Sequence, residues 1–284
     1  MPISLKTGLQ AIACRALAKG FSLAKPTAKI SDIGYVGCIE DNLLPGVSRA
    51  QFETELRKGD GNELESKFLA AHSSSALVVN CFAPFKIGKR ARELALAGTV
   101  GFNAVTFERK CPPGLRGGTA PNLDLVSEGQ TTVVAMESKC TEYFGVKVSR
   151  RFSPAYSAQI HDERRDGPWF ASMESIISGN SEFLHLDVPQ LIKHAFGLAR
   201  CFKGIPTILL YVFWEPANAF EFPIFEQHRD EIRRFQKMVN GSFPQFISMS
   251  YPELWDSWAS QVEVPSWLIE HIASLRERYF VSLA

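Results

Sequence analysis

The chain has 284 residues, of which 45% are hydrophobic and 21% are charged, as expected for a soluble globular protein. Its formal net charge of +1 excludes a strongly basic nucleic-acid-binding protein, so contact with a polyanion would have to come from local patches. No apolar run approaches the ~18 residues that span a bilayer, which argues against a membrane protein, and the six cysteines form no C-x-x-C pair, so we expect reduced thiols in the cytoplasm.

Residues 1–58 are predicted to form a basic helical extension. Their first acid is Asp32, and Leu9–Leu17 is amphipathic and rich in alanine. The early charges are not followed by a long apolar centre, so a secretory signal is not expected. A plain surface helix is the simplest interpretation; a basic arm near a polyanion and an organelle transit peptide are the alternatives. Glycine and polar residues at 58–62 indicate a break, after which one domain is predicted over 59–284.

A helix and a β-hairpin are predicted after this break. Apolar residues recur at steps of three and four over Glu63–Phe82, which indicates a helix with Asn62 as its N-cap. Three segments then predict strands, of which the first contains β-branched and aromatic residues and the third is rich in threonine and valine. They are Asn103–Glu108, Asn122–Val126 and Thr131–Glu137. A short polar turn separates the last two, so we expect them to form a tight hairpin.

The second half of the chain alternates further helices and strands. Residues 145–182 are rich in charges, serines and glycines and are predicted to be an insertion or a mobile loop. A helix is expected from Asp187 to Cys201, with Asp187 as N-cap, and the apolar run Pro206–Trp214 is typical of a buried strand. The remaining predicted elements are a helix over Pro223–Val239, a strand over Gln245–Ser250, and C-terminal helices over Pro252–Ala259 and Pro265–Tyr279. This order predicts an α/β fold with a mixed central sheet flanked by helices.

The predicted hairpin carries the residues that point to chemistry. Glu137 and Lys139 are separated by one residue on a strand, so both side chains project to the same face. Asp124 lies on the paired arm and can converge with them. Two carboxylates at one edge of a sheet suit Mg²⁺, which commonly takes one or two carboxylates together with waters and phosphate oxygens. A lysine beside such an ion can orient an attacking water and offset charge on a phosphate.

An acid on one strand, a hairpin, and then acid-x-lysine on the next strand resembles the PD-(D/E)XK, or restriction-endonuclease-like, nuclease superfamily. The acid-x-lysine is Glu137-Ser138-Lys139. The earlier acid is Asp124, in Asn-Leu-Asp where the family's motif has Pro-Asp, and the missing proline has no chemical role. The run that starts Glu63-Leu-x-x-Lys67-Phe68 is similar to that of a poorly characterised branch of the superfamily. The resemblance covers about residues 60–215 and does not account for the N-terminal arm or the C-terminal helices.

The resemblance implies a fold, a cofactor and a set of site residues. The fold is a restriction-endonuclease-like core, and the cofactor is Mg²⁺ or Mn²⁺. The implied metal ligands are Asp124, Glu137, Ser138, Glu63 and Glu65. The implied catalytic residues are Asp124, Glu137, Lys139, Glu63 and Gln190. Glu63 is favoured over Glu65 as the acid from the first helix, although both could be exposed first-turn acids, and Gln190 could equally be a helix-surface glutamine.

Three functions are compatible with the sequence. The first is a metal-dependent nuclease that hydrolyses phosphodiester bonds in DNA, or alternatively in RNA, as a restriction or defence-type endonuclease. The second is a catalytically silent nucleic-acid-binding protein with the same fold, and the third is an unrelated α/β protein with a chance motif. The intact set of two acids and a lysine favours the first, because binding alone does not need a metal-gathering cluster.

Partners follow from the favoured function. Nucleic-acid contacts are expected from Lys147, Arg150 and Arg151, which come soon after the catalytic strand. One site cuts one strand, so cleavage of both strands would most simply use a homodimer. Other polar residues are expected to have ordinary roles: the histidines have no paired metal spacing, and Glu215 is interpreted as an acid that ends a strand.

Overall fold

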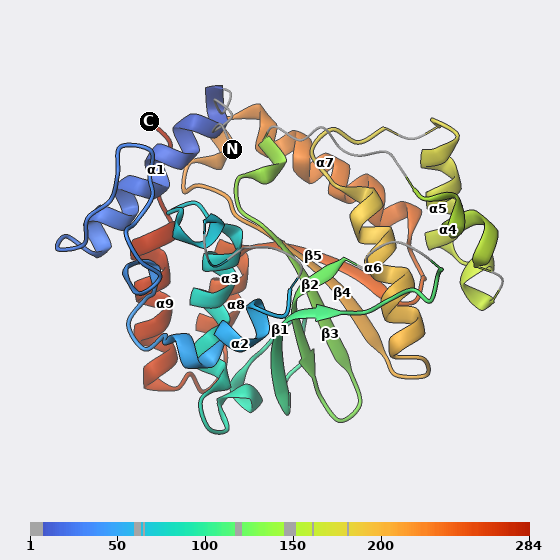
Figure 1. Ribbon diagram of the computed structural model, residues 1–284, viewed down its shortest axis with the longest axis horizontal. Helices are drawn as coiled ribbons and strands as arrows, with labels where there is room; N and C mark the ends of the chain where they lie inside the picture. The colour runs from blue at the N-terminus through green and yellow to red at the C-terminus, as the bar shows by residue number, and fades with distance from the viewer. Residues whose placement is uncertain are drawn as a thin grey trace.

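A central sheet separates two groups of helices (Figure 1). The computed structural model describes residues 8–59, 64, 66–116, 121–144, 152–160, 162–180 and 182–284. The strands are β1 (Ala104–Lys110), β2 (Asn122–Glu128), β3 (Val133–Lys139), β4 (Thr207–Phe213) and β5 (Gln245–Ser250). The α-helices are α1 (Gly8–Ala24), α2 (Glu53–Leu56), α3 (Ser74–Phe82), α4 (Pro154–Gln159), α5 (Pro168–Ile177), α6 (Val188–Cys201), α7 (Pro223–Met238), α8 (Tyr251–Ala259) and α9 (Ser266–Tyr279). Among the described residues, no helix has the length and apolar character needed to cross a bilayer.

The sheet is mixed, with its strands in the order β1-β2-β3-β4-β5. The first three strands form an antiparallel meander. β4 and β5 continue the sheet in parallel with β3, because the chain crosses over through α6 and then through α7. The predicted α/β class with a mixed sheet is therefore confirmed. The resemblance implies a core in which a helix, three strands, a helix and a strand follow one another, and α3, the meander, α6 and β4 have this order.

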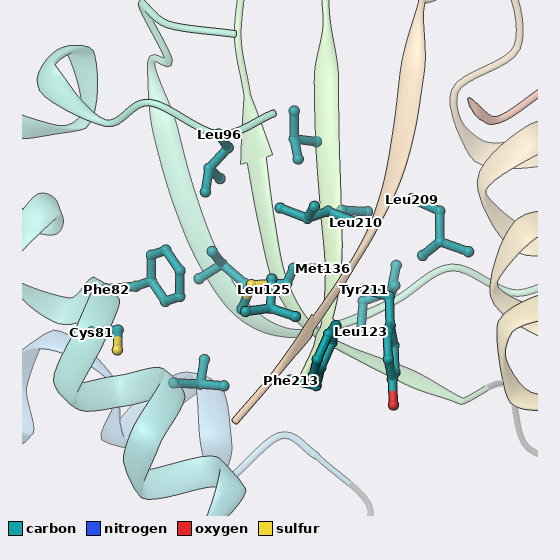
Figure 2. Close-up of a cluster of buried hydrophobic side chains, with 14 of the residues drawn as sticks. Cys81, Phe82, Leu96, Leu123, Leu125, Met136, Leu209, Leu210, Tyr211 and Phe213 are labelled. Carbon is teal, nitrogen blue, oxygen red and sulfur yellow. The ribbon is translucent and has the colours of Figure 1, made fainter. Parts of the chain in front are cut away.

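The two faces of the sheet are covered by different helices. Figure 2 shows Phe82 of α3 beside Leu125 of β2 and Met136 of β3, so α3 packs on one face. On the other face, the hydroxyl of Tyr211 in β4 lies 3.0 Å from the Nε2 atom of His228 in α7. Every residue of β4 is buried, as its continuous apolar run predicts for a strand covered on both faces.

The N-terminal helix α1 packs against the C-terminal helix α9. The side chain of Arg278 in α9 is 1% exposed and donates hydrogen bonds to the carbonyl oxygens of Leu17, at 3.0 Å, and Ala71, at 3.1 Å. These bonds satisfy a buried guanidinium with neutral acceptors and join α1, α9 and the segment before α3. The helix expected around Leu9–Leu17 is confirmed, and the domain boundary at residue 58 stays a prediction.

The first helix of the core begins later than predicted. α3 starts at Ser74, and the hydroxyl of Ser73 accepts a hydrogen bond from the Ala76 amide at 3.2 Å. The preceding residues Lys67–Leu69 form a single 3₁₀ turn instead of helix. The predicted start at Glu63 is therefore wrong, because apolar residues spaced at three and four continue through the turn and hide the true cap.

The described part of residues 145–182 is not a mobile loop. It contains α4 and α5, and α5 buries Trp169, Phe170 and Met173. Pro168 occupies the first turn of α5, where its missing amide hydrogen costs nothing. The mobile-loop prediction is wrong here because the charges and serines on either side conceal one short apolar helix face. The described residues of this segment thus place α4 and α5 between β3 and α6.

Helix α6 approaches its neighbours closely because of one glycine. Its N-cap is Asp187, whose side chain accepts from the Gln190 amide at 3.1 Å, as predicted. Gly197 lies against the chain just after β1, and a Cβ atom there would stand 1.9 Å from the carbonyl oxygen of Cys111. Any larger residue at this position would therefore push α6 away from the sheet.

We predict that Gly197→Ala destabilises the protein. The added methyl group cannot fit against a main-chain oxygen, and overpacking of this kind costs about 1–3 kcal/mol or more. Urea unfolding followed by circular dichroism measures the change. Gly8→Ala is the matched control, because a Cβ atom at Gly8 would meet nothing within 4 Å. Equal stability of wild type and Gly197→Ala would contradict the close packing of α6.

Candidate functional site

The candidate site lies where β2 and β3 stop pairing. The last residue pair at this end of the two strands is Leu125 with Met136. Beyond it, the main-chain amide of Ser138 donates to Oδ2 of Asp124 at 2.6 Å. A side-chain carboxylate thus takes the bond that a strand carbonyl would otherwise accept. This bond fixes Asp124 beside the end of β3.

Glu137 is the buried centre of the site. Its side chain is 3% exposed, and its two oxygen atoms face different partners. The Nζ atom of Lys139 donates to Oε1 at 2.5 Å. The Nε2 atom of His194 lies 2.9 Å from Oε2, although the angle departs from that of a regular hydrogen bond. Glu137 and Lys139 lie on one face of the sheet, as expected from their spacing of two residues along β3.

Helix α6 supplies two side chains to this pair. Gln190 and His194 are four residues apart, so they lie one above the other on the same helix face. Oε1 of Gln190 accepts a hydrogen bond from Nζ of Lys139 at 3.0 Å. The helix therefore contacts both members of the Glu137 and Lys139 pair.

The charges of this pair hold each other in the ionised state. Burial alone would raise the pKa of Glu137, but the nearby Lys139 and His194 outweigh burial and lower this pKa to about 2. Burial likewise opposes the charged form of Lys139, but Glu137 and Asp124 outweigh it and raise the pKa of the ammonium group. Glu137 is thus a carboxylate and Lys139 is a cation at neutral pH.

Asp124 behaves in the opposite way. Burial and the negative charge of Glu137 raise its pKa well above the ordinary value of 3.8, and the opposing effects of Lys139 and the Ser138 amide are smaller. Two carboxylates held this closely favour a shared proton or a bound cation. Asp124 is the residue whose charge state such a cation would change most.

A third acid near the site was not anticipated from the sequence. Glu108 of β1 stands opposite Asp124, between the pairs Phe107–Leu125 and Arg109–Leu123. Its negative charge also contributes to the raised pKa of Asp124. The backbone φ of Glu108 is +51°, a conformation that is uncommon for a residue other than glycine. The placement follows from strand register and backbone twist, for which the sequence has no signal.

The donor set fits a hard divalent cation. Asp124 and Glu137 offer carboxylate oxygens, and Oε2 of Glu137 is buried without a hydrogen bond. Within the described ranges, no three His, Cys, Asp or Glu residues are close enough to hold a metal ion by themselves. Waters, phosphate oxygens or residues outside these ranges would have to complete the coordination, and Mg²⁺ usually keeps several waters and binds substrate phosphate.

The remaining predicted residues fall into two groups. The hydroxyl of Ser138 lies 2.7 Å from that of Tyr251, and its side chain points to the sheet face opposite Glu137. The other predicted residues lie outside the part of the chain that the structure describes, so their roles stay predictions. They are Glu63, Glu65, Lys147, Arg150 and Arg151.

Two other polar residues have clear structural surroundings. Glu215 follows β4 and accepts two hydrogen bonds from Arg229 of α7, at 2.9 and 2.5 Å, which agrees with its interpretation as a strand-ending acid. His194, in contrast, was expected to be an ordinary polar residue and is 1% exposed against Glu137. The spacing of four from Gln190 was the one available signal, because it places both residues on a single helix face.

We predict that Asp124 makes the metal-free protein less stable as the pH rises. Its pKa is higher in the folded than in the unfolded chain, so the folded state keeps a proton that the unfolded state loses above about pH 3.8. The associated stability is present below that pH and is lost as the pH rises toward the folded pKa. Asp124→Asn keeps an acceptor for Ser138 and removes the titration. The melting temperature of Asp124→Asn minus that of wild type should therefore be larger at pH 8 than at pH 4.

The measurement is thermal unfolding at several pH values with a chelator present. Each kcal/mol corresponds to about 2–4 °C in a large domain. Asp256→Asn is the control, because Asp256 is an exposed aspartate that pairs with Arg276 on the surface. A difference between Asp124→Asn and wild type that does not vary with pH would argue against a raised pKa of Asp124 in the folded protein.

Comparison with known proteins agrees with this geometry. Searches among curated proteins and solved structures found no match. A family model described as "Restriction Endonuclease associating with ARP" matches residues 14–280, which is nearly the whole chain. Membership of a restriction endonuclease family implies a nuclease with a restriction-endonuclease-like fold, as the motif and the mixed sheet indicated. The chain belongs to the family of restriction endonucleases associating with ARP.

Proposed function

We propose that this protein is a Mg²⁺- or Mn²⁺-dependent endonuclease that hydrolyses phosphodiester bonds in DNA. The observation that carries the proposal is the meeting of Asp124, Glu137 and Lys139 at one end of β2 and β3. A nucleic-acid-binding protein without turnover would not need two interacting carboxylates with a buried lysine beside them. RNA is the alternative substrate.

Asp124 and Glu137 are the proposed metal ligands from this chain. When bound, the cation would polarise the scissile phosphate and lower the pKa of an attacking water. Metal binding would favour the ionised form of Asp124, against the burial and the charge of Glu137 that raise its pKa. Glu137 is already ionised and is held in place by its contacts with Lys139 and His194. The acids Glu63 and Glu65 remain proposed additional ligands, with Glu63 favoured. Ser138 remains a proposed ligand only through its main-chain carbonyl oxygen, because its side chain contacts Tyr251 on the opposite face of the sheet.

Lys139 is the proposed catalytic cation. Its ammonium group has three donors, of which one is directed to Glu137 and one to Gln190. The third is available for a water or a phosphate oxygen. A fixed positive charge at this point would stabilise negative charge that develops on the phosphate. Gln190 would keep the ammonium group in position.

The partner, the cellular location and the oligomeric state are also proposed, from the sequence and the family. The family description includes association with ARP, and we propose the same association for this chain. No disulfide joins the six cysteines, which suits a reducing cytoplasm. Cutting both strands of a duplex would most simply use a homodimer.

We expect Lys139→Ala to abolish most hydrolysis while the protein stays folded and binds metal. The carboxylates remain, but a positioned electrostatic group is lost, which reduces the rate ~10²-fold or more. Lys139→Arg should not restore full activity, because a planar guanidinium cannot replace a compact ammonium group. The assay measures cleavage of plasmid, linear duplex and single-stranded DNA with Mg²⁺ or Mn²⁺.

Lys203→Ala is the control for this substitution. Lys203 is an exposed lysine that pairs with Glu163, and its loss removes the same charge from the surface. This variant should cleave like wild type. Wild-type cleavage by Lys139→Ala would instead favour the binding-only function or a chance motif.

A second prediction concerns Lys147, Arg150 and Arg151, which follow β3 closely in sequence. If they neutralise phosphates, replacing all three with alanine should weaken DNA binding and reduce its salt dependence by a slope of about 1 per lost contact. Fluorescence anisotropy at several salt concentrations measures the slope. The control replaces Lys203, Arg233 and Arg276, which each pair with an acid; Lys203 and Arg233 are exposed, and Arg276 is half-buried. Equal salt-dependence slopes for the two triple variants would contradict the proposed phosphate contacts of Lys147, Arg150 and Arg151.

A further inference from the structure

His194 is a buried side chain of the site that the sequence motif does not include. It lies in the middle of α6 and is 1% exposed. Its Nε2 atom faces Oε2 of Glu137 at 2.9 Å. Neither of these two atoms has a hydrogen-bond partner elsewhere in the described part of the chain. A buried imidazole nitrogen and a buried carboxylate oxygen thus depend on each other.

Geometry places this contact opposite the one from Lys139. Lys139 engages Oε1 and His194 faces Oε2, so the two side chains hold the carboxylate of Glu137 from both ends. Each carboxylate oxygen can accept in two directions, so one partner on each leaves one direction free. Without His194, the carboxylate could rotate about its last bond and would lose the partner of one buried oxygen.

The position of α6 makes the contact rigid. Gln190, His194 and Gly197 lie on the same helix face, at steps of four and three residues. Gly197 sets how close the helix comes to the chain after β1, and Gln190 contacts Lys139. Rotation or withdrawal of α6 would therefore disturb all three contacts together. His194 is held by the same packing that forms the site.

We propose that His194 is a positioning residue that donates a hydrogen bond from Nε2 to Oε2 of Glu137 and thereby orients this carboxylate toward a divalent cation. The inference rests on the proposed function, because it assumes that Glu137 is a metal ligand. Groups that orient metal ligands typically change metal affinity about 10- to 100-fold when they are removed. His194 itself does not touch the ion.

The test is calorimetric binding of Mn²⁺ to the full-length protein without DNA. His194→Leu removes the donor and retains apolar bulk, and its affinity for Mn²⁺ should fall about 10- to 100-fold. His194→Gln retains an amide donor near the position of Nε2 and should recover most of the affinity. Cleavage of DNA by His194→Leu should approach the wild-type rate when Mn²⁺ is raised well above its new dissociation constant. Circular dichroism establishes that each variant is folded, and an unfolded His194→Leu is replaced by His194→Met.

His271→Gln is the matched control. His271 is also a buried histidine, 6% exposed, and its Nε2 lies 3.1 Å from the Cys81 carbonyl oxygen in a different part of the fold. This variant should lose thermal stability and keep wild-type Mn²⁺ affinity. A general effect of removing a buried histidine is thereby separated from an effect on the site.

Two results would overturn the inference while leaving the proposed function intact. The first is wild-type Mn²⁺ affinity in His194→Leu. The second is a nitrogen bound directly to Mn²⁺ in pulsed electron paramagnetic resonance of wild type, lost in His194→Gln, because His194 would then be a ligand. If wild type itself neither binds Mn²⁺ nor cleaves DNA, the proposed function fails, and the inference fails with it.

Discussion

The site depends on how a carboxylate can be buried at the end of a strand. Glu137 is 2% exposed, and an isolated buried carboxylate is so costly that it would take up a proton. Lys139 and His194 remove that cost from two sides and keep it ionised. One partner comes from the same strand and follows from local geometry. The other comes from α6, so the charge state of Glu137 depends on how the helix packs on the sheet.

Close packing of α6 therefore has a functional as well as a structural effect. Gly197 allows the helix to meet the main chain at Cys111, and the buried strand β4 supports the same layer. Gln190 and His194 reach the end of β3 from this helix. Their polar contacts would be lost if the distance increased by a fraction of an ångström. A site built from helix and strand residues is more precise than one built from loops.

The two acids of the site differ because their surroundings differ. Glu137 has two partners that favour the charged form, whereas Asp124 accepts one amide hydrogen bond and faces the negative charges of Glu137 and Glu108. In this unequal pair the pKa of Glu137 is lowered and that of Asp124 is raised, so a bound cation would change the charge of Asp124 more than that of Glu137. Proteins often hold such destabilising arrangements at functional sites, because the surrounding fold is stable enough to tolerate them.

The sequence alone determined the elements that depend on local pattern. Alternation along a strand put Glu137 and Lys139 on one face, and Asp187 fixed the start of α6. Only the tertiary structure decided which groups meet: His194 with Glu137, the Ser138 amide with Asp124, and Glu108 opposite Asp124. The tertiary structure also showed that the first core helix, α3, begins at Ser74. Periodicity reports which face a residue occupies, but distance and depth depend on register and helix packing between segments far apart in the chain.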